Sequence, residues 1–456
     1  MKILMVSWFF PPANTIGAVR MGRMARFLSQ QGHDLKVLAA EELPFPKTLP
    51  LEVPEEQVLY APWADVNALP DRLTDAAKFV LRPFLSSGKQ QNSGDSAGSE
   101  AQISTTAEQT QTPSTPSALK RLRSSLGGLY SNAVNLPDAR IGWMPYAMSR
   151  GRKLLKEWKP DVIYATGPPF TGLLIGYRLS KRFDVPLITE LRDRWVDDPY
   201  YPPPDWRLRI DGSLERRVIG RSSALVTVSE PWAEDYRAKY GKPVAVVYNG
   251  YDPEALEGAP SMGSSEDVAL RIVYTGGIYP GRRDPAPLFA AMQSLNLSPD
   301  RIRMDFYGTN PDHVWPIARQ YAVEPLVSVN PPVTHREAVE LQQNADILLL
   351  MQWNDPREQG NVPGKLFEYM GARRPILLLG LEDGVPAAFL REREAGFYGG
   401  SPERIAEQLK IWLDMKRTGG IPPLPEAARS GLTRDDQYSK LDRFLGEIIS
   451  PGGAKG

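Results

Sequence analysis

The first forty residues, MKILMVSWFFPPANTIGAVRMGRMARFLSQQGHDLKVLAA (1–40), alternate between two kinds of pattern. Residues 2–8 are nearly all apolar, as in a strand that is buried on both faces. Residues 18–32 carry apolar side chains at helical spacing and end at Gly32, and residues 33–40 form a second strand-like run. Two strands joined through a helix in so short a segment predict a parallel pair with a right-handed crossover.

The same alternation continues along the chain in two series. Further strands are expected at 161–166, 186–191, 224–229 and 244–249, and then at 270–276, 302–308, 326–330, 345–351 and 375–380. A stretch rich in Gly and Ser, residues 257–267, separates the two series. We therefore expect an α/β protein with two doubly wound, Rossmann-like domains, 1–255 and 268–433, that face each other across a cleft. The last helical run, 434–450, is followed by no strand and is expected to pack back on the first domain.

The composition limits the classes of protein and of site. Lys+Arg and Asp+Glu both number 54, so no net charge favours binding to nucleic acid. There is no cysteine, which excludes disulfides, thiol catalysis and cysteine zinc sites, and only three histidines remain for a metal centre. No apolar run approaches the roughly 20 residues that span a bilayer, and no cleavage site follows the apolar N-terminus closely. We expect a cytoplasmic protein without a metal or cofactor.

A lysine and a glutamate follow a glycine-containing loop in GNVPGKLFEYMGARRPI (360–376). A Walker A loop is excluded, since three residues rather than four separate Gly360 from Gly364, and neither Ser nor Thr follows the lysine. The free N–H groups of a helix that begins near Gly364 would attract a diphosphate, and Lys365 would add positive charge. Glu368 lies on the same helical face, where its carboxylate can accept hydrogen bonds from a ribose. The alternative is an ordinary helix with a Lys–Glu surface pair.

The segment VPGKLFEYMGARRPILLL (362–379) resembles the donor-site signature of retaining GT-B glycosyltransferases, in particular the family 4-like group that builds bacterial surface polysaccharides. Similar pieces occur in the same order along nearly the whole chain outside 86–118, at 7–38, 136–143, 160–170, 190–199, 248–253 and 274–285. The resemblance implies a nucleotide-sugar donor, most often UDP-linked, bound by the C-terminal domain. It also implies a glycan or polyprenyl-linked acceptor bound by the N-terminal domain, with transfer that retains the anomeric configuration.

One position departs from the family pattern. In the family, a glutamate at the place of Glu368 contacts the nucleotide ribose, and a second glutamate eight residues earlier often faces the sugar. This chain has Gly360 at that earlier place. Related subgroups share the glycine, so the departure leaves the donor sugar open without excluding catalysis. Glu358, two residues earlier, is a candidate substitute.

The turn YTGGIYPGRRDP (274–285) follows a predicted strand and carries a second group of candidates. Gly276 and Gly277 turn the chain, and Arg282 and Arg283 follow. Family members place a basic residue here against the donor diphosphate, which becomes the leaving group. Arginine can donate two hydrogen bonds to a phosphate and stabilise its developing charge without Mg²⁺. The sequence does not choose between the arginines, and a solvated basic turn is the alternative.

The loop before the first helix is expected to face the cleft. Gly17 would let the backbone approach a phosphate or the acceptor, and Arg20 in the first turn would reach the same anion. The alternative is a helix N-terminus that is simply capped by Asn14 or Thr15.

ELRDRWVDDP (190–199) follows another predicted strand, at the same edge of the sheet. Glu190 and Asp193 are therefore candidate catalytic residues, for proton transfer or acceptor binding. A structural Arg192–Asp193 ion pair is the alternative. His33 begins a strand and is expected to be structural.

The remaining segments bear on membrane contact. Residues 86–118 hold no aromatic residue and are expected to form a disordered insertion. Residues 118–134 are basic and amphipathic, as in a core helix, a solvated helix or a membrane-surface helix. Basic residues in 119–123, with Trp143 and Tyr146, are candidates for lipid contact at the inner membrane face.

The resemblance implies a metal-independent glycosyltransferase of surface polysaccharide synthesis. Two other classes remain open on the same fold. One is a sugar-nucleotide epimerase, and the other is a non-catalytic scaffold of a polysaccharide-assembly complex.

Overall fold

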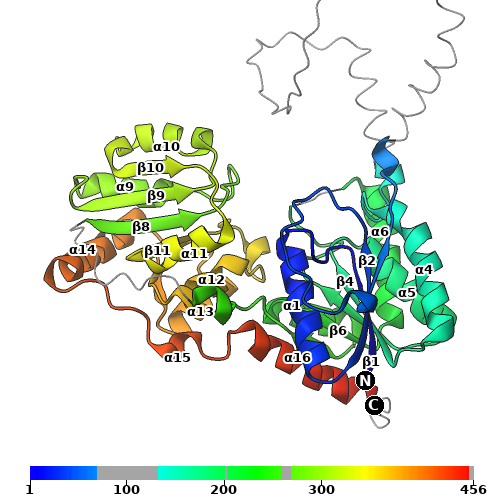
Figure 1. The fold of residues 1–456 in the computed structure, drawn as a ribbon. Coiled ribbons are helices and arrows are strands. Elements are labelled where there is room, and N and C mark those ends of the chain that lie inside the picture. Colours follow the sequence, from blue (N-terminus) through cyan, green and yellow to red (C-terminus); the bar gives the residue numbers. More distant parts are fainter. Residues whose placement is uncertain (69–131, 201–202, 258–268, 451–456) are drawn as a thin grey trace, which may run out of the picture.

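The computed structural model describes residues 1–68, 132–200, 203–257 and 269–450. In these residues the chain forms two α/β domains, each built on one sheet of parallel strands (Figure 1). The predicted fold class, with two Rossmann-like doubly wound domains, is confirmed. The predicted disordered insertion (86–118), the basic residues in 119–123 and most of the 257–267 linker lie outside the described residues.

The sheet of the N-terminal domain has the strand order β3-β2-β1-β4-β5-β6-β7. Its strands are β1 (Lys2–Ser7), β2 (Asp34–Ala40), β3 (Val58–Ala61), β4 (Val162–Gly167), β5 (Leu187–Leu191), β6 (Ala224–Thr227) and β7 (Val244–Val246). Ile3 of the central strand pairs with Leu35 on one side and Val162 on the other. The strands are nearly all apolar because helices cover both faces of the sheet.

Alternate residues of β1 point into two hydrophobic cores. The covering helices are α1 (Ile16–Gln30), α4 (Met144–Glu157), α5 (Thr171–Phe183), α6 (Asp205–Arg221), α7 (Glu230–Tyr240) and α16 (Arg434–Ile449). Leu4 and Val6 belong to the core with side chains of α4, α5, α6 and α7, whereas Ile3 and Met5 belong to the core with side chains of α1 and α16. Short 3-10 turns lie at η1 (Glu55–Gln57), η2 (Val66–Ala68) and η3 (Ile141–Trp143).

The sheet of the C-terminal domain has the equivalent order β10-β9-β8-β11-β12-β13. Its strands are β8 (Leu270–Thr275), β9 (Ile302–Tyr307), β10 (Val327–Asn330), β11 (Ile347–Met351), β12 (Ile376–Leu379) and β13 (Gly396–Tyr398). The helices are α8 (Pro253–Leu256), α9 (Ala286–Ser294), α10 (Trp315–Gln320), α11 (His335–Gln343), α12 (Gly364–Ala372), α13 (Val385–Glu392), α14 (Pro402–Thr418) and α15 (Glu426–Arg429), with short turns η4 (Pro311–His313), η5 (Glu324–Leu326) and η6 (Pro356–Glu358). One core contains side chains of α9, α10 and α14, and the other contains those of α12, α13 and α15.

The chain passes between the domains twice, and the two crossing segments are paired. The Tyr251 N–H donates to Leu432 O (3.0 Å), and the Arg434 N–H donates to Tyr251 O (2.9 Å). Beyond this bridge, α16 runs along α1 of the N-terminal domain (Figure 1), where the Tyr438 hydroxyl donates to the Arg20 carbonyl at 3.1 Å. The last helix of the chain therefore packs on the first domain.

Among the described residues, no helix is both long enough and apolar enough to cross a membrane.

Candidate functional site

A cavity of about 630 Å³ lies between the domains, with walls from both of them. The wall that the C-terminal domain contributes contains the ends of β8 and β11 and the beginning of α12. The carboxyl ends of the strands are the usual place for a ligand in an open parallel sheet. The predicted residues that line it are Arg20, Gly276, Gly277, Arg283, Gly364, Lys365 and Glu368. Four predicted residues lie elsewhere, namely Gly17, Glu190, Asp193 and Arg282.

The beginning of α12 presents free backbone donors to this cavity. Pro363 is the N-cap residue and supplies no side-chain hydrogen bond, and the first turn holds no acidic residue. The first N–H groups of the helix and its dipole are therefore available to an anion. Leu366 and Phe367 are buried in the core, so the remaining face of the helix turns Lys365 and Glu368 into the cavity.

Lys365 lies directly over the turn that follows β8. Its Nζ is 4.4 Å from the centre of the Tyr274 ring and donates to the Tyr274 hydroxyl at 3.2 Å. Below it, Gly276 has φ +114°, and a Cβ at that position would lie 2.5 Å from the lysine Nζ. Burial, together with the charge of Arg283, lowers the pKa of Lys365 to about 8. A bound anion would replace the lost solvation of this ammonium.

Glu368 lines the same cavity, beside Gln342 of α11. Gln342 Nε2 donates to Thr275 Oγ1 at 3.0 Å and lies 3.5 Å from Glu368 Oε2. Gln342 Oε1 is buried and has no hydrogen-bond partner. The Glu368 carboxylate, held beside the Gln342 amide, thus offers an acceptor to ligand hydroxyls such as those of a ribose.

Several residues of the cavity were not predicted from the sequence. They are Asn249, Tyr307, His335, Gln342 and Arg434. They come from α11, from the end of β9, from the beginning of α16 and from the loop after β7, and none stands in a motif that marks it as a ligand residue.

The two adjacent arginines have different surroundings. Arg283 lines the cavity, donates to the Gly277 carbonyl at 3.3 Å and stacks on Tyr279. Arg282 instead stacks on Tyr200 of the N-terminal domain, at 4.2 Å from the ring centre, and on Trp353, at 4.9 Å. The geometry therefore favours Arg283 for contact with a ligand in the cavity and places Arg282 in an aromatic contact between the domains.

Glu190 does not face the cleft, contrary to our expectation. It is fully buried in β5, where it accepts hydrogen bonds from Arg20 Nη2 at 2.7 Å and from Thr166 Oγ1 at 2.5 Å. Burial alone would raise the pKa of this carboxyl, but Arg20, Arg192 and Thr166 together hold the pKa of Glu190 below its usual value. Glu190 is therefore a charged partner of Arg20, and a substrate cannot reach it in this conformation.

Arg20 donates most of its hydrogen bonds to other groups of the protein. Besides Glu190, it donates to the carbonyls of Val247 and Tyr248, both at 3.0 Å, and to Asn249 Oδ1 at 3.1 Å. It reaches the edge of the cavity but is only 3% exposed. Its position indicates a residue that fixes the cavity wall.

Gly17 and its neighbours also differ from the expected arrangement. Gly17 is buried, and a Cβ there would lie 3.0 Å from the Phe9 ring and 3.3 Å from Arg192 Nη1. Thr15 caps α1, since its side chain accepts from the Ala18 N–H at 3.1 Å. The N-terminus of α1 is therefore capped by the protein's own Thr15, which is the alternative that the sequence left open.

Asp193 and His33 occupy separate places. Asp193 keeps contact with solvent and lines a second, smaller pocket between the domains. Partial loss of solvation beside the surrounding protein raises the pKa of Asp193, against the opposing charge of Arg192. His33 Nε2 lies 2.7 Å from Asp442 Oδ1 of α16, which gives this histidine a structural contact far from the cavity.

No group of three or more His, Cys, Asp and Glu side chains suited to a metal ion occurs in the part of the chain that the structure describes.

The chain was compared with known proteins. Residues 112–255 match the model of Glycosyltransferase Family 4. A search of curated proteins found no match. Solved structures with a similar fold include a glycosyltransferase from Rickettsia africae (12% identity, TM-score 0.58, 99% of each chain) and Anabaena HepE in complex with UDP (14% identity, TM-score 0.57, 98% of this chain and 100% of the other). Sucrose-phosphate synthase from Thermosynechococcus elongatus is a third (11% identity, TM-score 0.60, 99% of each chain).

The likeness to these structures extends over nearly the whole chain and shows that the fold is GT-B. The match to Glycosyltransferase Family 4 covers much of the N-terminal domain. Together they confirm the resemblance to family 4-like GT-B glycosyltransferases that the sequence motifs indicated.

We predict that Glu190→Gln destabilises the protein by about 3–5 kcal/mol, because it leaves the buried Arg20 guanidinium without its counter-charge. Urea unfolding of the purified variant measures this loss. Glu254→Gln is the matched control: Glu254 pairs with Arg23 and Arg26 at the surface, where its side chain is 54% exposed, and its removal should cost less than about 1 kcal/mol. A Glu190→Gln protein of normal stability that has lost turnover would instead place Glu190 in contact with substrate.

Proposed function

We propose that this protein is a retaining glycosyltransferase, which moves a sugar from a UDP-linked donor to a glycan or polyprenyl-linked acceptor in surface polysaccharide synthesis. The observation that supports it most directly is the placement of Lys365. This lysine lies at the free N-terminus of α12, over Gly276, with Glu368 one turn deeper in the same cavity. A site for a diphosphate next to an acceptor for hydroxyl groups is what a nucleotide requires. A Lys–Glu pair on the surface of a helix would not combine the two.

In the proposed complex, the donor diphosphate lies against Lys365, Arg283 and the first N–H groups of α12. The ribose hydroxyls donate to the Glu368 carboxylate. The leaving diphosphate gains negative charge as the bond to the sugar breaks, and fixed positive groups stabilise that charge without solvent reorganisation. Two cationic side chains and a helix N-terminus supply the charge that Mg²⁺ supplies elsewhere, so we propose a metal-independent reaction.

The choice of UDP draws on one of the similar structures. Anabaena HepE was solved in complex with UDP and with UDP-glucose. The retention of configuration and the acceptor class are those of the resembling family.

We predict that one family of nucleoside diphosphates raises the thermal unfolding midpoint of the protein. A ligand at 100 times its Kd adds about 2.7 kcal/mol to the stability of the folded state. Lys365→Ala and Glu368→Ala should each weaken this ligand roughly 10- to 100-fold, because each removes a hydrogen bond to or from a charged group. A panel of nucleoside diphosphates and nucleotide sugars, followed by thermal shift, measures the effect.

Matched controls exist on α14 of the same domain. Lys410→Ala and Glu407→Ala remove the same residue types from exposed positions and should leave nucleotide binding unchanged. Binding without transfer to any acceptor, but with release of the nucleotide, would favour a sugar-nucleotide epimerase. Absence of any nucleotide effect on the wild type would favour a non-catalytic scaffold.

We also predict that UDP binding weakens between pH 7 and pH 9. The pKa of Lys365 is about 8 in the empty site, so the ammonium is present below pH 8 and is lost as the pH rises above it. The diphosphate binds the charged form, so its Kd should rise roughly tenfold over this interval. Isothermal titration at several pH values measures it. Lys365→Ala should bind weakly with no such pH dependence, and an equally flat wild-type profile would contradict the proposed role.

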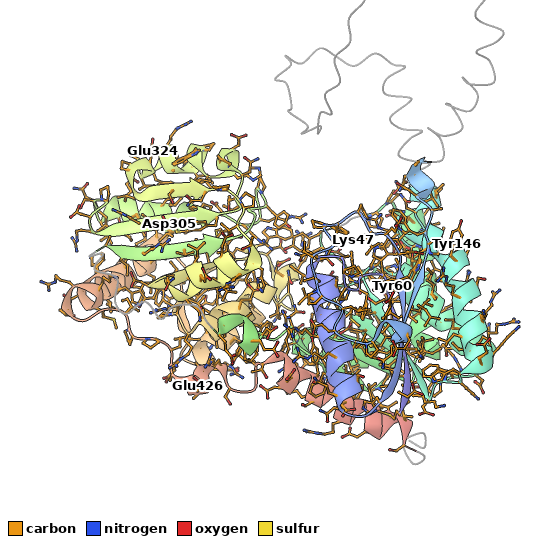
Figure 2. The ribbon with its side chains drawn as sticks, viewed as in Figure 1. Lys47, Tyr60, Tyr146, Asp305, Glu324 and Glu426 are labelled. Atoms are coloured by element: carbon orange, nitrogen blue, oxygen red, sulfur yellow. The ribbon has the colours of Figure 1, made fainter. Side chains whose placement is uncertain are left out.

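A basic face of the N-terminal domain supports the proposal of peripheral membrane contact. The exposed charged residues of α4, α5 and α6 are basic except Glu157 and Asp205; they are Arg150, Arg152, Lys153, Lys156, Arg178, Lys181, Arg182, Arg209, Arg216 and Arg217. The apolar side chains Tyr146, Trp206, Leu208 and Ile210 are exposed on α4 and α6, and Tyr146 lies on the side away from the C-terminal domain (Figure 2). Anionic headgroups attract such a face, and apolar side chains insert between them.

Trp143 cannot contribute to this contact as we had expected. It is fully buried and packs edge-on against Trp8, with ring centres 5.5 Å apart.

We predict that the protein floats with vesicles that contain phosphatidylglycerol and does not float with purely zwitterionic ones. The double variant Arg150→Glu/Lys153→Glu should bind at least tenfold more weakly, since each basic residue near an anionic surface contributes about 1 kcal/mol. Lys410→Glu/Arg417→Glu, on the exposed side of α14, is the control with the same charge change. Equal flotation of both double variants would exclude this face as the membrane contact.

A further inference from the structure

Two aromatic side chains and an arginine join the domains beside the smaller pocket, which has a volume of about 240 Å³ and is lined in part by Tyr200. Tyr200 comes from the loop after β5 of the N-terminal domain, whereas Arg282 and Trp353 come from the loops after β8 and β11 of the C-terminal domain. Cζ of Arg282 lies 4.2 Å from the centre of the Tyr200 ring and 4.9 Å from that of Trp353, and the two ring centres are 6.0 Å apart. These three residues are named the clamp.

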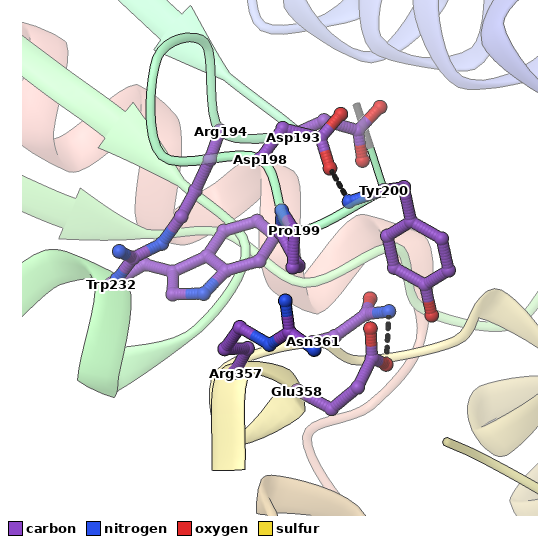
Figure 3. A pocket seen from close by; sticks show the side chains of 9 residues that line it. All are labelled: Asp193, Arg194, Asp198, Pro199, Tyr200, Trp232, Arg357, Glu358 and Asn361. Atoms are coloured by element: carbon purple, nitrogen blue, oxygen red, sulfur yellow. Dashed lines mark hydrogen bonds between the residues drawn. The ribbon is translucent and has the colours of Figure 1, made fainter. Parts of the chain in front are cut away.

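The Tyr200 hydroxyl adds a contact with a third residue of the C-terminal domain. It donates a hydrogen bond to the buried carboxylate of Glu358, toward which the side chain extends in Figure 3. Burial and this carboxylate together raise the pKa of the hydroxyl well above its usual value, so the hydroxyl remains a donor at neutral pH. The ring and the hydroxyl of one tyrosine thus each contact the opposite domain.

The loop that carries Tyr200 is fastened to helices of its own domain. The Val196 N–H donates to Glu215 Oε2 of α6 at 3.2 Å. Lys239 Nζ of α7 donates to Asp197 Oδ2 at 3.1 Å. Because the loop is fixed in this way, the contacts of Tyr200 constrain the position of one domain relative to the other.

The arginine of the clamp belongs to a turn that also lines the larger cavity. The N–H groups of Arg282 and Arg283 both donate to the Tyr279 carbonyl at 3.0 Å, and Gly281 between them and that carbonyl has φ +74°. Arg283 lines the larger cavity, while Arg282 stacks on Tyr200. A ligand anion that holds Arg283 therefore restricts the same turn that presents Arg282 to the opposite domain.

The larger cavity extends from the crossing segments of the chain to the turn beside the clamp. Asn249 and Arg434, next to the crossing segments, are among its lining residues, and so is Arg283. The crossing segments hold the domains together through the continuous backbone and its hydrogen bonds. The clamp holds them through side chains alone. Small contacts between domains usually permit relative motion, so the clamp contacts can form and break while the crossing segments stay intact.

We propose that Tyr200, Arg282 and Trp353 form an interdomain clamp that holds the cleft closed, and that an anion bound to Arg283 strengthens it. A ligand in the larger cavity reaches both walls when the domains are close together, so the ligand and the clamp favour the same closed arrangement. Loss of the clamp lowers the population of that arrangement, and the apparent Kd of the ligand rises by the same factor. The choice of a nucleotide as the ligand rests on the proposed function, whereas the clamp itself does not.

Fluorescence energy transfer between the domains tests the clamp. The chain has no cysteine, so Arg209→Cys on α6 and Gln320→Cys on α10, both at exposed positions, take a donor and an acceptor dye without competing sites. In the free protein, Tyr200→Ala should lower the transfer efficiency, because the domains spend more time apart. UDP should raise the transfer efficiency of the wild type. By isothermal titration, Tyr200→Ala should bind UDP roughly tenfold more weakly, through the loss of one cation–π contact and one aromatic pair.

Two further variants separate the clamp from general damage to the fold. Tyr200→Phe keeps the ring and removes the hydroxyl, so it should retain most of the closure and of the UDP affinity that Tyr200→Ala loses. Tyr146→Ala is the matched control, since Tyr146 is 44% exposed and Tyr200 is 37% exposed. Tyr146 lies on the side of the N-terminal domain away from the C-terminal domain (Figure 2), and its removal should change neither measurement.

The proposal is overturned if Tyr200→Ala and Arg282→Ala both show the transfer efficiency of the wild type, with and without UDP. A fall in transfer efficiency with unchanged UDP affinity would support the clamp and overturn its link to Arg283. Failure of UDP to bind the wild type would contradict the proposed function. In that case the comparison of the free proteins still decides for or against the clamp, because it is made without a ligand.

Discussion

The arrangement of the two domains depends on the buried ion pair between Arg20 and Glu190. The Arg20 guanidinium donates to the carbonyls of Val247 and Tyr248. These two residues lie where the chain leaves the N-terminal domain. The backbone carbonyl of Arg20 accepts a hydrogen bond from the hydroxyl of Tyr438. Tyr438 lies on α16, where the chain returns to the N-terminal domain. One residue of α1 thus holds both crossings of the chain. Because Asn249 is bound to this arginine and also lines the larger cavity, the ion pair sets part of the wall of the site.

The sequence predicts the sheets well because their strands are buried on both faces. A strand with this burial must be continuously apolar, and the runs at 270–276, 302–308 and 345–351 stand out for that reason. The edge strands β3 and β13 were not expected. They have four and three residues, and an edge position demands little apolar surface, so they leave no comparable pattern.

The site is predictable only where its residues share one local element. Lys365 and Glu368 lie one helical turn apart, so their spacing predicts that they share one face of the helix, and both line the larger cavity. Glu190 gives no such signal, because a carboxylate at the end of a strand can face the cleft or a partner, and its partner Arg20 lies 170 residues away. Arg282 and Arg283 are neighbours in sequence, but only Arg282 stacks on Tyr200 and Trp353. The sequence alone could not show this difference, because both aromatic residues lie far from the arginines along the chain.

The two cavities between the domains have opposite electrostatic character, and this separation can sort the parts of one substrate. Arg283 and Lys365 line the larger cavity beside a helix N-terminus, so negative charge is favoured there. Asp193 and Glu358 line the smaller one, whose arginines are neutralised by aspartates outside it. Negative charge on a ligand is therefore favoured in the first cavity and disfavoured in the second. A difference of this kind between two neighbouring cavities would orient a ligand that carries a charged and a neutral part before any specific contact is made.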